Sequence, residues 1–443
     1  MPQHTQLLRV LGVVFGLAAV VGGTVGQGIL RAPGVVAQAD GSVGLLLGLW
    51  LLGGVLSLVL ALPFAELGAA IPSAGGGIDY AGRAFGPVVR VFAAWLLLVA
   101  WIAALAMVTY VVGEFLVRLG VGGGAIGPGW QALGCLALFY VLNALGTKVA
   151  GSIQIGFAAL KGGLLIALVV ALFAQVPSSA PPPPMPDGAG TAVAYATALM
   201  LVIGACNGWA ALVNYGEEIE NPGRAIPRAL FGGIAAVTML YLAVNAAMFH
   251  VLPPAALAVS DFAAADAAKD VFGNAGDRVF TAFGVISVGA IANMMLMTTT
   301  RIAFATARAG ILSTRLTAVS PRGVPLAAMA LVAFASAAFI LSGTYLALAS
   351  TSTAMQQGIY ILVTLSAIWL RHREPNLPRP FQIPAFPVLI GLVLAINAAL
   401  MAVFFVQDWW NTMLGFIIVT ILTFGSVILR REPWPTDSTA DIR

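Results

Sequence analysis

Apolar residues run through this chain in long stretches that short polar segments interrupt. From Leu11 to Leu429, windows of mostly apolar residues recur almost without a gap, each long enough for a membrane-spanning helix of about 20 residues. With Gly, Pro and charged residues as boundaries, the pattern predicts twelve such spans. They begin near Leu11, Val43, Val88, Gln131, Gly151, Ala192, Ala229, Val279, Pro325, Thr344, Pro387 and Trp409.

Composition agrees with a chain that lies in the lipid bilayer. Of its 443 residues, 60% are hydrophobic and 9% are charged, whereas a soluble globular domain keeps about a quarter of its residues charged. The spans leave no stretch long enough for a soluble domain. The first span shows no cleavage site of a signal peptide, so we expect it to be retained.

The positive charges predict the orientation of the spans. An even number of spans places both termini on one side, and loops rich in Lys and Arg face the cytoplasm. With the N-terminus inside, Arg31, Arg118, Lys269 and Arg278 would lie outside and Lys161 within a span, which leaves sixteen of the 21 Lys and Arg residues on the cytoplasmic side. We therefore expect a multi-pass protein of a cell membrane, most simply a bacterial inner membrane, with both termini cytoplasmic. The net charge of +4 is explained by this topology rather than by a nucleic-acid partner.

Helix-breaking residues interrupt the first and the sixth predicted span. The breaks read GGTVGQG at 22–28 and GACNG at 204–208, and a proline-rich loop from Pro177 to Asp187 separates the two halves of the chain. Broken helices at corresponding positions of two halves point to a transporter binding site built from inverted repeats. The alternative is that the glycines only let helices pack closely. Clustering at both matched places favours the site.

Five motifs occur in a fixed order relative to the predicted spans. The chain resembles the amino acid, polyamine and organocation permease superfamily, specifically its L-type amino-acid transporter-like and related bacterial branches. The motifs are 23–30 (GTVGQGIL), 65–87 (AELGAAIPSAGGGIDYAGRAFGP), Gly208-Trp209 with 217–229 (EEIENPGRAIPRA), 301–310 (RIAFATARAG), and Arg379-Pro380-Phe381 with Pro384. At Gln27, Ile78 and Gly204 the chain departs from the usual residues, which leaves substrate size and the outer gate open.

The resemblance implies an all-α membrane protein of the LeuT type, with twelve transmembrane helices. Residues 1–176 would form the first inverted repeat of five spans, and 177–191 an external loop. Residues 192–370 would form the second repeat, and 371–443 two further spans with a cytoplasmic tail.

An amino acid in the middle of a bilayer must exchange water for polar partners, because an unpaired charge in hydrocarbon costs several kcal/mol. A broken helix supplies these partners from its backbone. Free N–H groups at the start of the second helix half suit a carboxylate, and carbonyls left free before a break suit an ammonium group. The expected donors are Gly26, Gln27 and Gly28, and the expected acceptors lie around Gly22, Ile203 and Gly204.

Side chains at the breaks are further candidates. Thr24 and Gln27 offer hydrogen bonds, although Thr24 has the alternative of bonding to its own helix. Trp209 is suited to a pocket wall, with ordinary packing as the alternative. Three polar candidates, each with an ordinary interhelical hydrogen bond as the alternative, are Cys206, Asn207 and Asn293.

Lys161 is the one Lys or Arg placed well inside a predicted span. An ammonium group there must be paired, hydrated or neutral, so a functional role is the first interpretation, with snorkelling toward the interface as the alternative. The resemblance implies that Lys161 lies where sodium binds in other members of the fold, and that it couples to the first span. On the cytoplasmic face, Glu217, Glu218, Arg224, Arg301 and Arg308 are predicted to be either gate ion pairs or solvated charges.

The leading hypothesis is a secondary transporter of amino acids, neutral and sodium-independent, that works by proton symport or by exchange. Export of an amine or amino-acid derivative is the alternative. A membrane-embedded enzyme is disfavoured because the spans contain no His, Cys and carboxylate cluster with ligand spacing, so we expect no cofactor, metal or catalytic residue. Some members of the family have an accessory protein, but nothing in this chain specifies one.

Overall fold

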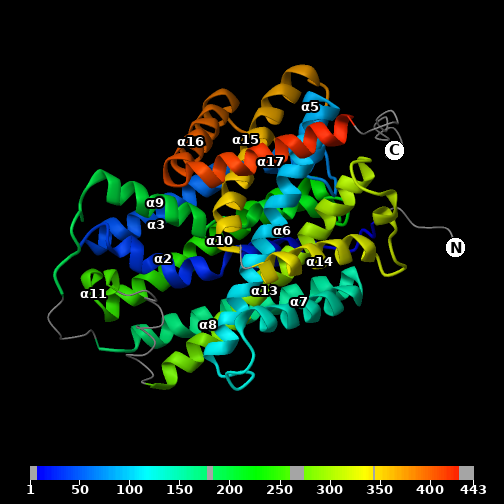
Figure 1. Cartoon of the computed structure of the whole chain (residues 1–443). Coiled ribbons are helices and arrows are strands. Elements are labelled where there is room, and N and C mark those ends of the chain that lie inside the picture. Colours follow the sequence, from blue (N-terminus) through cyan, green and yellow to red (C-terminus); the bar gives the residue numbers. More distant parts are fainter. Residues whose placement is uncertain (1–6, 177–182, 260–273, 343–344, 429–443) are drawn as a thin grey trace.

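The computed structural model describes residues 7–176, 183–259, 274–342 and 345–428, and these form a bundle of helices (Figure 1). In the described ranges, β pairing is limited to one isolated parallel bridge between Leu11 and Ile219. Most of the expected proline-rich loop lies outside the described residues. The fold class is therefore all-helical, as the apolar windows predict.

Nine helical segments of the described chain are long and apolar enough to cross a membrane. They are Val43–Ala70, Pro87–Arg118, Thr147–Phe173, Ala192–Tyr215, Pro222–Val251, Thr281–Arg308, Ser352–Arg373, Phe386–Val406 and Trp409–Ile428. The other three expected spans correspond to shorter helices, namely α1 (Val13–Thr24), α7 (Pro128–Ala144) and α14 (Leu326–Ser342). A helix of 17 residues such as α7 or α14 is about 26 Å long, close to the thickness of the hydrocarbon core.

The remaining helices complete the chain in order. They are α2 (Gln27–Ala37), α3 (Val43–Leu60), α4 (Leu62–Ala70), α5 (Gly77–Phe85), α6 (Pro87–Arg118), α8 (Thr147–Phe173), α9 (Ala192–Ala205), η1 (Trp209–Tyr215), α10 (Pro222–Val251), α11 (Pro254–Ala258), α13 (Asn274–Arg308), η2 (Thr314–Thr317), α15 (Tyr345–Arg373), α16 (Phe386–Gln407) and α17 (Trp409–Ile428).

Most helices start within a few residues of the predicted positions, but α10 starts earlier. We expect the seventh span near Ala229, whereas α10 begins at Pro222, about two turns before. Proline is favoured at the first helical position because its missing N–H has no helical partner there. The apolar pattern detects only the apolar part of a helix. It therefore does not include the polar first turns of α10.

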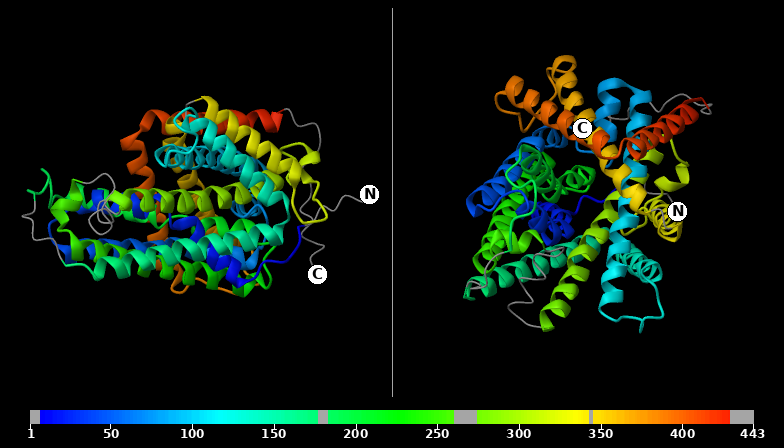
Figure 2. Two further views of the ribbon diagram at one scale, coloured as in Figure 1. Left: turned by 90° about the horizontal axis from the view of Figure 1, so that it is seen from below. Right: turned by 60° about the vertical axis from the view of Figure 1, so that its left-hand side comes forward.

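The buried apolar side chains form two clusters that meet at the helix breaks. Phe15 and Val20 of α1 belong to the larger cluster, together with side chains of α4, α6, α13 and α15. Val25 and Ile29, just beyond the first break, belong to the smaller cluster with α3, α9 and α10. The breaks therefore lie at the boundary between two packed regions. The two described ends of the chain lie at the same end of the bundle (Figures 1 and 2).

Candidate functional site

The first predicted break is an interruption between two helices. Helix α1 ends at Thr24 and α2 begins at Gln27. Val25 has extended torsions, its N–H closes the last turn of α1 by donating to the Val21 carbonyl over 2.9 Å, and Gly26 is extended too. Gly22 and Gly23 weaken the last turn of α1, because glycine favours a helix less than other residues.

The second predicted break has a different shape. Helix α9 ends at Ala205, and Cys206, Asn207 and Gly208 connect it to the 3-10 helix η1, which starts at Trp209. The sixth apolar segment therefore continues as a tighter helix. A 3-10 stretch inside a longer helical segment often marks a strained or functional position.

The two breaks touch each other through their backbones. A Cβ atom on Gly208 would lie 2.5 Å from the Gly23 carbonyl oxygen, and one on Gly28 would lie 2.9 Å from the Ala205 Cα atom. Both distances are too short for any side chain. Glycine is therefore required at Gly208 and Gly28 for this approach.

Tyr241 of α10 connects the breaks from one side. Its buried hydroxyl lies 3.0 Å from the Thr24 carbonyl oxygen and 3.2 Å from the Ala205 carbonyl oxygen. These carbonyls are at the ends of α1 and α9, where helix carbonyls lack a partner in their own helix. A single donor thus serves both helix ends.

Lys161 of α8 reaches the first break from the other side. The ammonium group is fully buried and donates to the carbonyl oxygens of Gly22 and Val25, each over 2.5 Å. The hydroxyl of Ser287 on α13 lies 3.4 Å from the same Val25 oxygen. The ion pairs found in the described ranges do not include Lys161, so backbone carbonyls are its hydrogen-bond partners.

Three buried amides form a chain next to Lys161. Asn143 of α7 donates to Asn293 of α13 over 2.8 Å, and Asn293 donates to Gln154 of α8 over 3.1 Å. A Cβ atom on Gly22 would lie 2.4 Å from the Gln154 Nε2 atom, so this amide packs directly against the first break. Asn293 thus makes interhelical hydrogen bonds, which the sequence analysis gave as the alternative to a role in the pocket.

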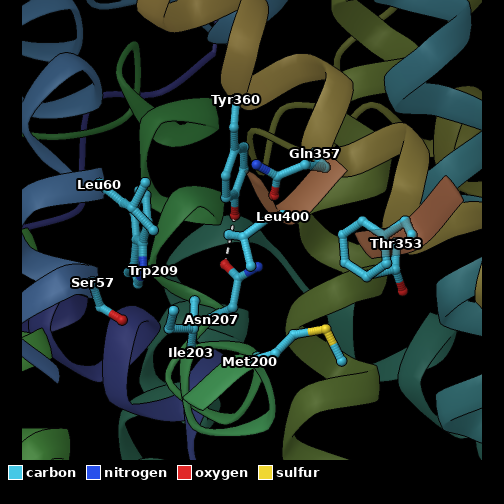
Figure 3. Close-up of a pocket in the computed structure, with 12 residues that line it drawn as sticks. Ser57, Leu60, Met200, Ile203, Asn207, Trp209, Thr353, Gln357, Tyr360 and Leu400 are labelled. Carbon is cyan, nitrogen blue, oxygen red and sulfur yellow. Dashed lines mark hydrogen bonds between the residues drawn. The ribbon is translucent and has the colours of Figure 1, made fainter. Parts of the chain in front are cut away.

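A cavity of about 50 Å³ lies beside the second break (Figure 3). Asn207 is at its centre, and its amide oxygen accepts a hydrogen bond from the Tyr360 hydroxyl over 2.6 Å. The indole of Trp209 packs against the Tyr360 ring with centroids 5.5 Å apart. The lining residues are Ser57, Leu60, Met200, Ile203, Gly204, Asn207, Trp209, Thr353, Gln357, Tyr360, Leu400 and Phe404.

The predicted site residues fall into three groups. Ile203, Gly204, Asn207 and Trp209 line the cavity. The first break contains Gly22, Thr24, Gly26 and Gly28. The Gly22 carbonyl accepts a hydrogen bond from Lys161. The Thr24 hydroxyl is buried and has no partner among the described residues. Cys206 and Asn293 are buried and do not line the cavity. The side chain of Gln27 lies outside the described part.

Sequence reasoning missed several residues of this region. Tyr241 was not predicted, and neither were the cavity residues of α15 and α16, such as Gln357, Tyr360 and Leu400. One signal was present, because Gln357 and Tyr360 are polar groups three positions apart in an apolar window and therefore share a helix face. Nothing local indicates that α16 contributes to the same cavity.

Four of the five predicted gate charges form ion pairs after the second break, and the described residues show no ion pair of Arg224. Glu218 and Arg301 make a buried bidentate pair with distances of 2.7 and 2.9 Å. Glu217 pairs with the more exposed Arg308 over 2.5 Å, and the Glu218 carbonyl accepts from the backbone N–H groups of Val10 and Leu11. These contacts join α13, the segment after η1 and the start of the chain.

Comparison with known proteins identifies the family. A family model for amino acid permeases matches residues 6–424. The chain therefore belongs to the amino acid permease family, within the amino acid, polyamine and organocation superfamily, as the motifs predict.

Three individual relatives are named as amino-acid transporters or exchangers. The serine/threonine exchanger SteT of Bacillus subtilis is 26% identical over 410 residues, which covers 88% of this chain and 91% of that protein. Asc-type amino acid transporter 1 of Mus musculus is 28% identical over 453 residues, covering 97% and 83%. The human cystine/glutamate transporter is 28% identical over 428 residues, covering 94% and 84%. These relatives are amino-acid transporters and exchangers, so the chain is a transporter of this class rather than an enzyme.

Proposed function

We propose that this protein is a sodium-independent secondary transporter of neutral amino acids, working by exchange or by proton symport. The observation that carries the proposal is the backbone contact between the two interrupted helices at Gly23 and Gly208. Such paired breaks place unbonded backbone groups within the membrane, where a substrate carboxylate and ammonium group need partners.

The proposed architecture is the LeuT type with twelve spans. Residues 1–176 and 192–370 are the two inverted repeats, 177–191 the external loop, and 371–443 the two additional spans with a cytoplasmic tail. The breaks in α1/α2 and in α9/η1 fall in the first span of each repeat, which supports this division. In alternating access, the first and sixth spans would rotate about the breaks. Both termini would remain on the cytoplasmic side of a bacterial inner membrane.

The candidate carboxylate donors are the N–H groups at the start of α2, from Gly26 to Gly28. Lys161 supports sodium independence, because its ammonium group already supplies a positive charge to the carbonyls of Gly22 and Val25. The neutral substrate class is supported by the described residues that line the cavity, none of which is charged. An unpaired substrate charge there would lose its hydration without compensation.

Uptake into liposomes by the purified protein tests this proposal. We expect uptake of labelled neutral amino acids in sodium-free buffer, driven either by an internal amino acid or by an imposed proton gradient. A requirement for sodium would contradict the proposal. Transport of amines in place of amino acids would instead favour the alternative, the export of an amine or an amino-acid derivative.

A further inference from the structure

We propose that Gln154 of α8 is a positioning residue that holds the last turn of α1 whenever Lys161 releases it. This role rests on the proposed amino-acid transport, in which the first span moves, and it adds a second donor for the carbonyls of the first break. The observations behind it are a directed chain of three buried amides and a buried donor at its end, the Gln154 Nε2 atom, which has no partner among the described residues.

Helix α8 presents one buried face to α1. Phe15 lies against Gly151 near the start of α1, and Gly22 lies against Gln154 near its end, so the two helices run in the same direction. Gln154 and Lys161 are two helical turns apart on this face, about 10 Å along the axis. The buried residues of the face are Thr147, Ala150, Gly151, Gln154, Ala158, Lys161 and Leu165.

The amide chain has a direction that is fixed at its start. Asn143 donates through Nδ2 to the Phe139 carbonyl over 2.7 Å, and a carbonyl can only accept. The same Nδ2 group therefore also donates to the Asn293 oxygen, and the Nδ2 group of Asn293 donates to the Gln154 oxygen. This order leaves the Gln154 Nε2 group as the free donor at the end of the chain.

The free donor faces the first break. A Cβ atom on Gly22 would lie 2.4 Å from the Gln154 Nε2 atom, so the absence of a side chain at Gly22 lets the amide reach the backbone of α1. In this structure the Gly22 carbonyl accepts from Lys161 instead. A buried donor without a partner is unfavourable, so the Gln154 amide is poised for an acceptor that α1 offers in another position.

Movement of α1 would create that acceptor. The last carbonyls of a helix have no partner within the helix, and those of Gly22 and Val25 depend on Lys161 here. If α1 moves away from Lys161, these oxygens lose their donor inside the membrane, which is costly. The Gln154 amide lies next to Gly22 and takes its carbonyl, so Gln154 lowers the free energy of the displaced α1.

The test is the double variant Gln154→Met/Asn293→Leu, which replaces both partners of one hydrogen bond by apolar groups of similar size. Asn143 keeps its bond to Phe139, and neither substituted residue lines the cavity. Exchange of labelled threonine, serine or alanine, whichever the wild type takes up fastest, is measured in liposomes. We expect the maximal rate to fall about tenfold, as for one lost hydrogen bond, with the half-saturation concentration changed less than twofold and the unfolding temperature retained.

Gln131→Met is the matched control. Gln131 of α7 is a buried amide that donates to the Val121 and Ile126 carbonyls in the loop before α7, far along the chain from the first break. Its loss leaves two carbonyls without this donor and should lower the unfolding temperature. We expect the exchange rate of the folded control to remain at the wild-type value.

Hydrogen–deuterium exchange of the backbone of α1 tests the same role without a substrate. The double variant should exchange more slowly than the wild type in residues 13–24, because the displaced state of α1 is less populated. Gln154→Met alone is measured in the same way if the double variant does not fold.

Faster hydrogen exchange of α1 in the variant would show a merely structural role and overturn the inference. An unchanged maximal rate, or an equal loss of rate in Gln131→Met, would do the same. If the wild type takes up no amino acid, the proposed function fails, and hydrogen exchange of α1 still decides the role of Gln154.

Discussion

The two helix breaks touch each other, yet different kinds of groups hold them. At the first break, the buried ammonium of Lys161 binds the carbonyls of Gly22 and Val25. At the second break, a neutral hydroxyl, that of Tyr360, binds the side chain of Asn207. The first break is enclosed by α8 and α13, whereas the second adjoins an open cavity.

This difference suggests a division of labour within one site. We propose that Lys161, whose ammonium group binds carbonyls at the first break that would otherwise attract a cation, acts in coupling. We propose that the second break, where neutral groups adjoin a cavity, contributes to selectivity. Tyr241 bonds to a carbonyl of each break and so holds the two breaks together.

Gly28→Leu should abolish uptake while leaving the protein inserted in the membrane. Any side chain at this position meets the Cα of Ala205, 2.9 Å from the added Cβ, and must push the breaks apart. Liposome uptake and substrate binding by the purified variant are the measurements. Gly391→Leu is the matched control, and wild-type affinity in folded Gly28→Leu would remove Gly28 from the site.

Tyr241→Phe should reduce uptake about tenfold and lower thermal stability, since it leaves two buried carbonyls without their shared donor at a cost of about 1–3 kcal/mol. The ring itself remains packed edge-on against Trp50, with centroids 5.5 Å apart. The measurements are uptake rate and unfolding temperature in detergent. Tyr195→Phe is the control, because that hydroxyl bonds to Asp40 near the start of α9. Equal behaviour of the two variants would refute a bridging role for Tyr241.

Tyr360→Phe should have the smallest effect, a loss of uptake of a few-fold. It removes one hydrogen bond to Asn207, worth about 1 kcal/mol, and keeps the ring contacts with Trp209 and Phe64. We expect the change to differ between threonine and alanine as substrates, while sodium independence is retained. A new sodium requirement in this variant would contradict the assignment of the second break to selectivity.

Much of the first break could be predicted from sequence, because its signals are local. Glycine destabilises a helix, and glycines cluster at both breaks, although the pairs at 53–54, 162–163 and 232–233 lie within continuous helices. An ammonium group in an apolar window needs backbone or charged partners, which indicated Lys161. The cavity depends on tertiary contacts that no local pattern encodes. Leu400 and Phe404 look like any lipid-facing residues of α16 until α9 and α15 pack beside them. Asn293 had two interpretations, and only the structure places it between Asn143 and Gln154.

The central claim is that the Lys161 ammonium replaces a bound cation at the first break. Uptake of a neutral amino acid into liposomes, measured with and without sodium for wild type, Lys161→Ala and Lys148→Ala, tests it most directly. Lys148 lies on the same helix but is exposed. The account predicts equal wild-type uptake in both buffers, a loss of about tenfold or more in Lys161→Ala because two buried carbonyls lose their donor, and wild-type behaviour of Lys148→Ala. A sodium requirement in the wild type, or full activity of Lys161→Ala in sodium-free buffer, would contradict it.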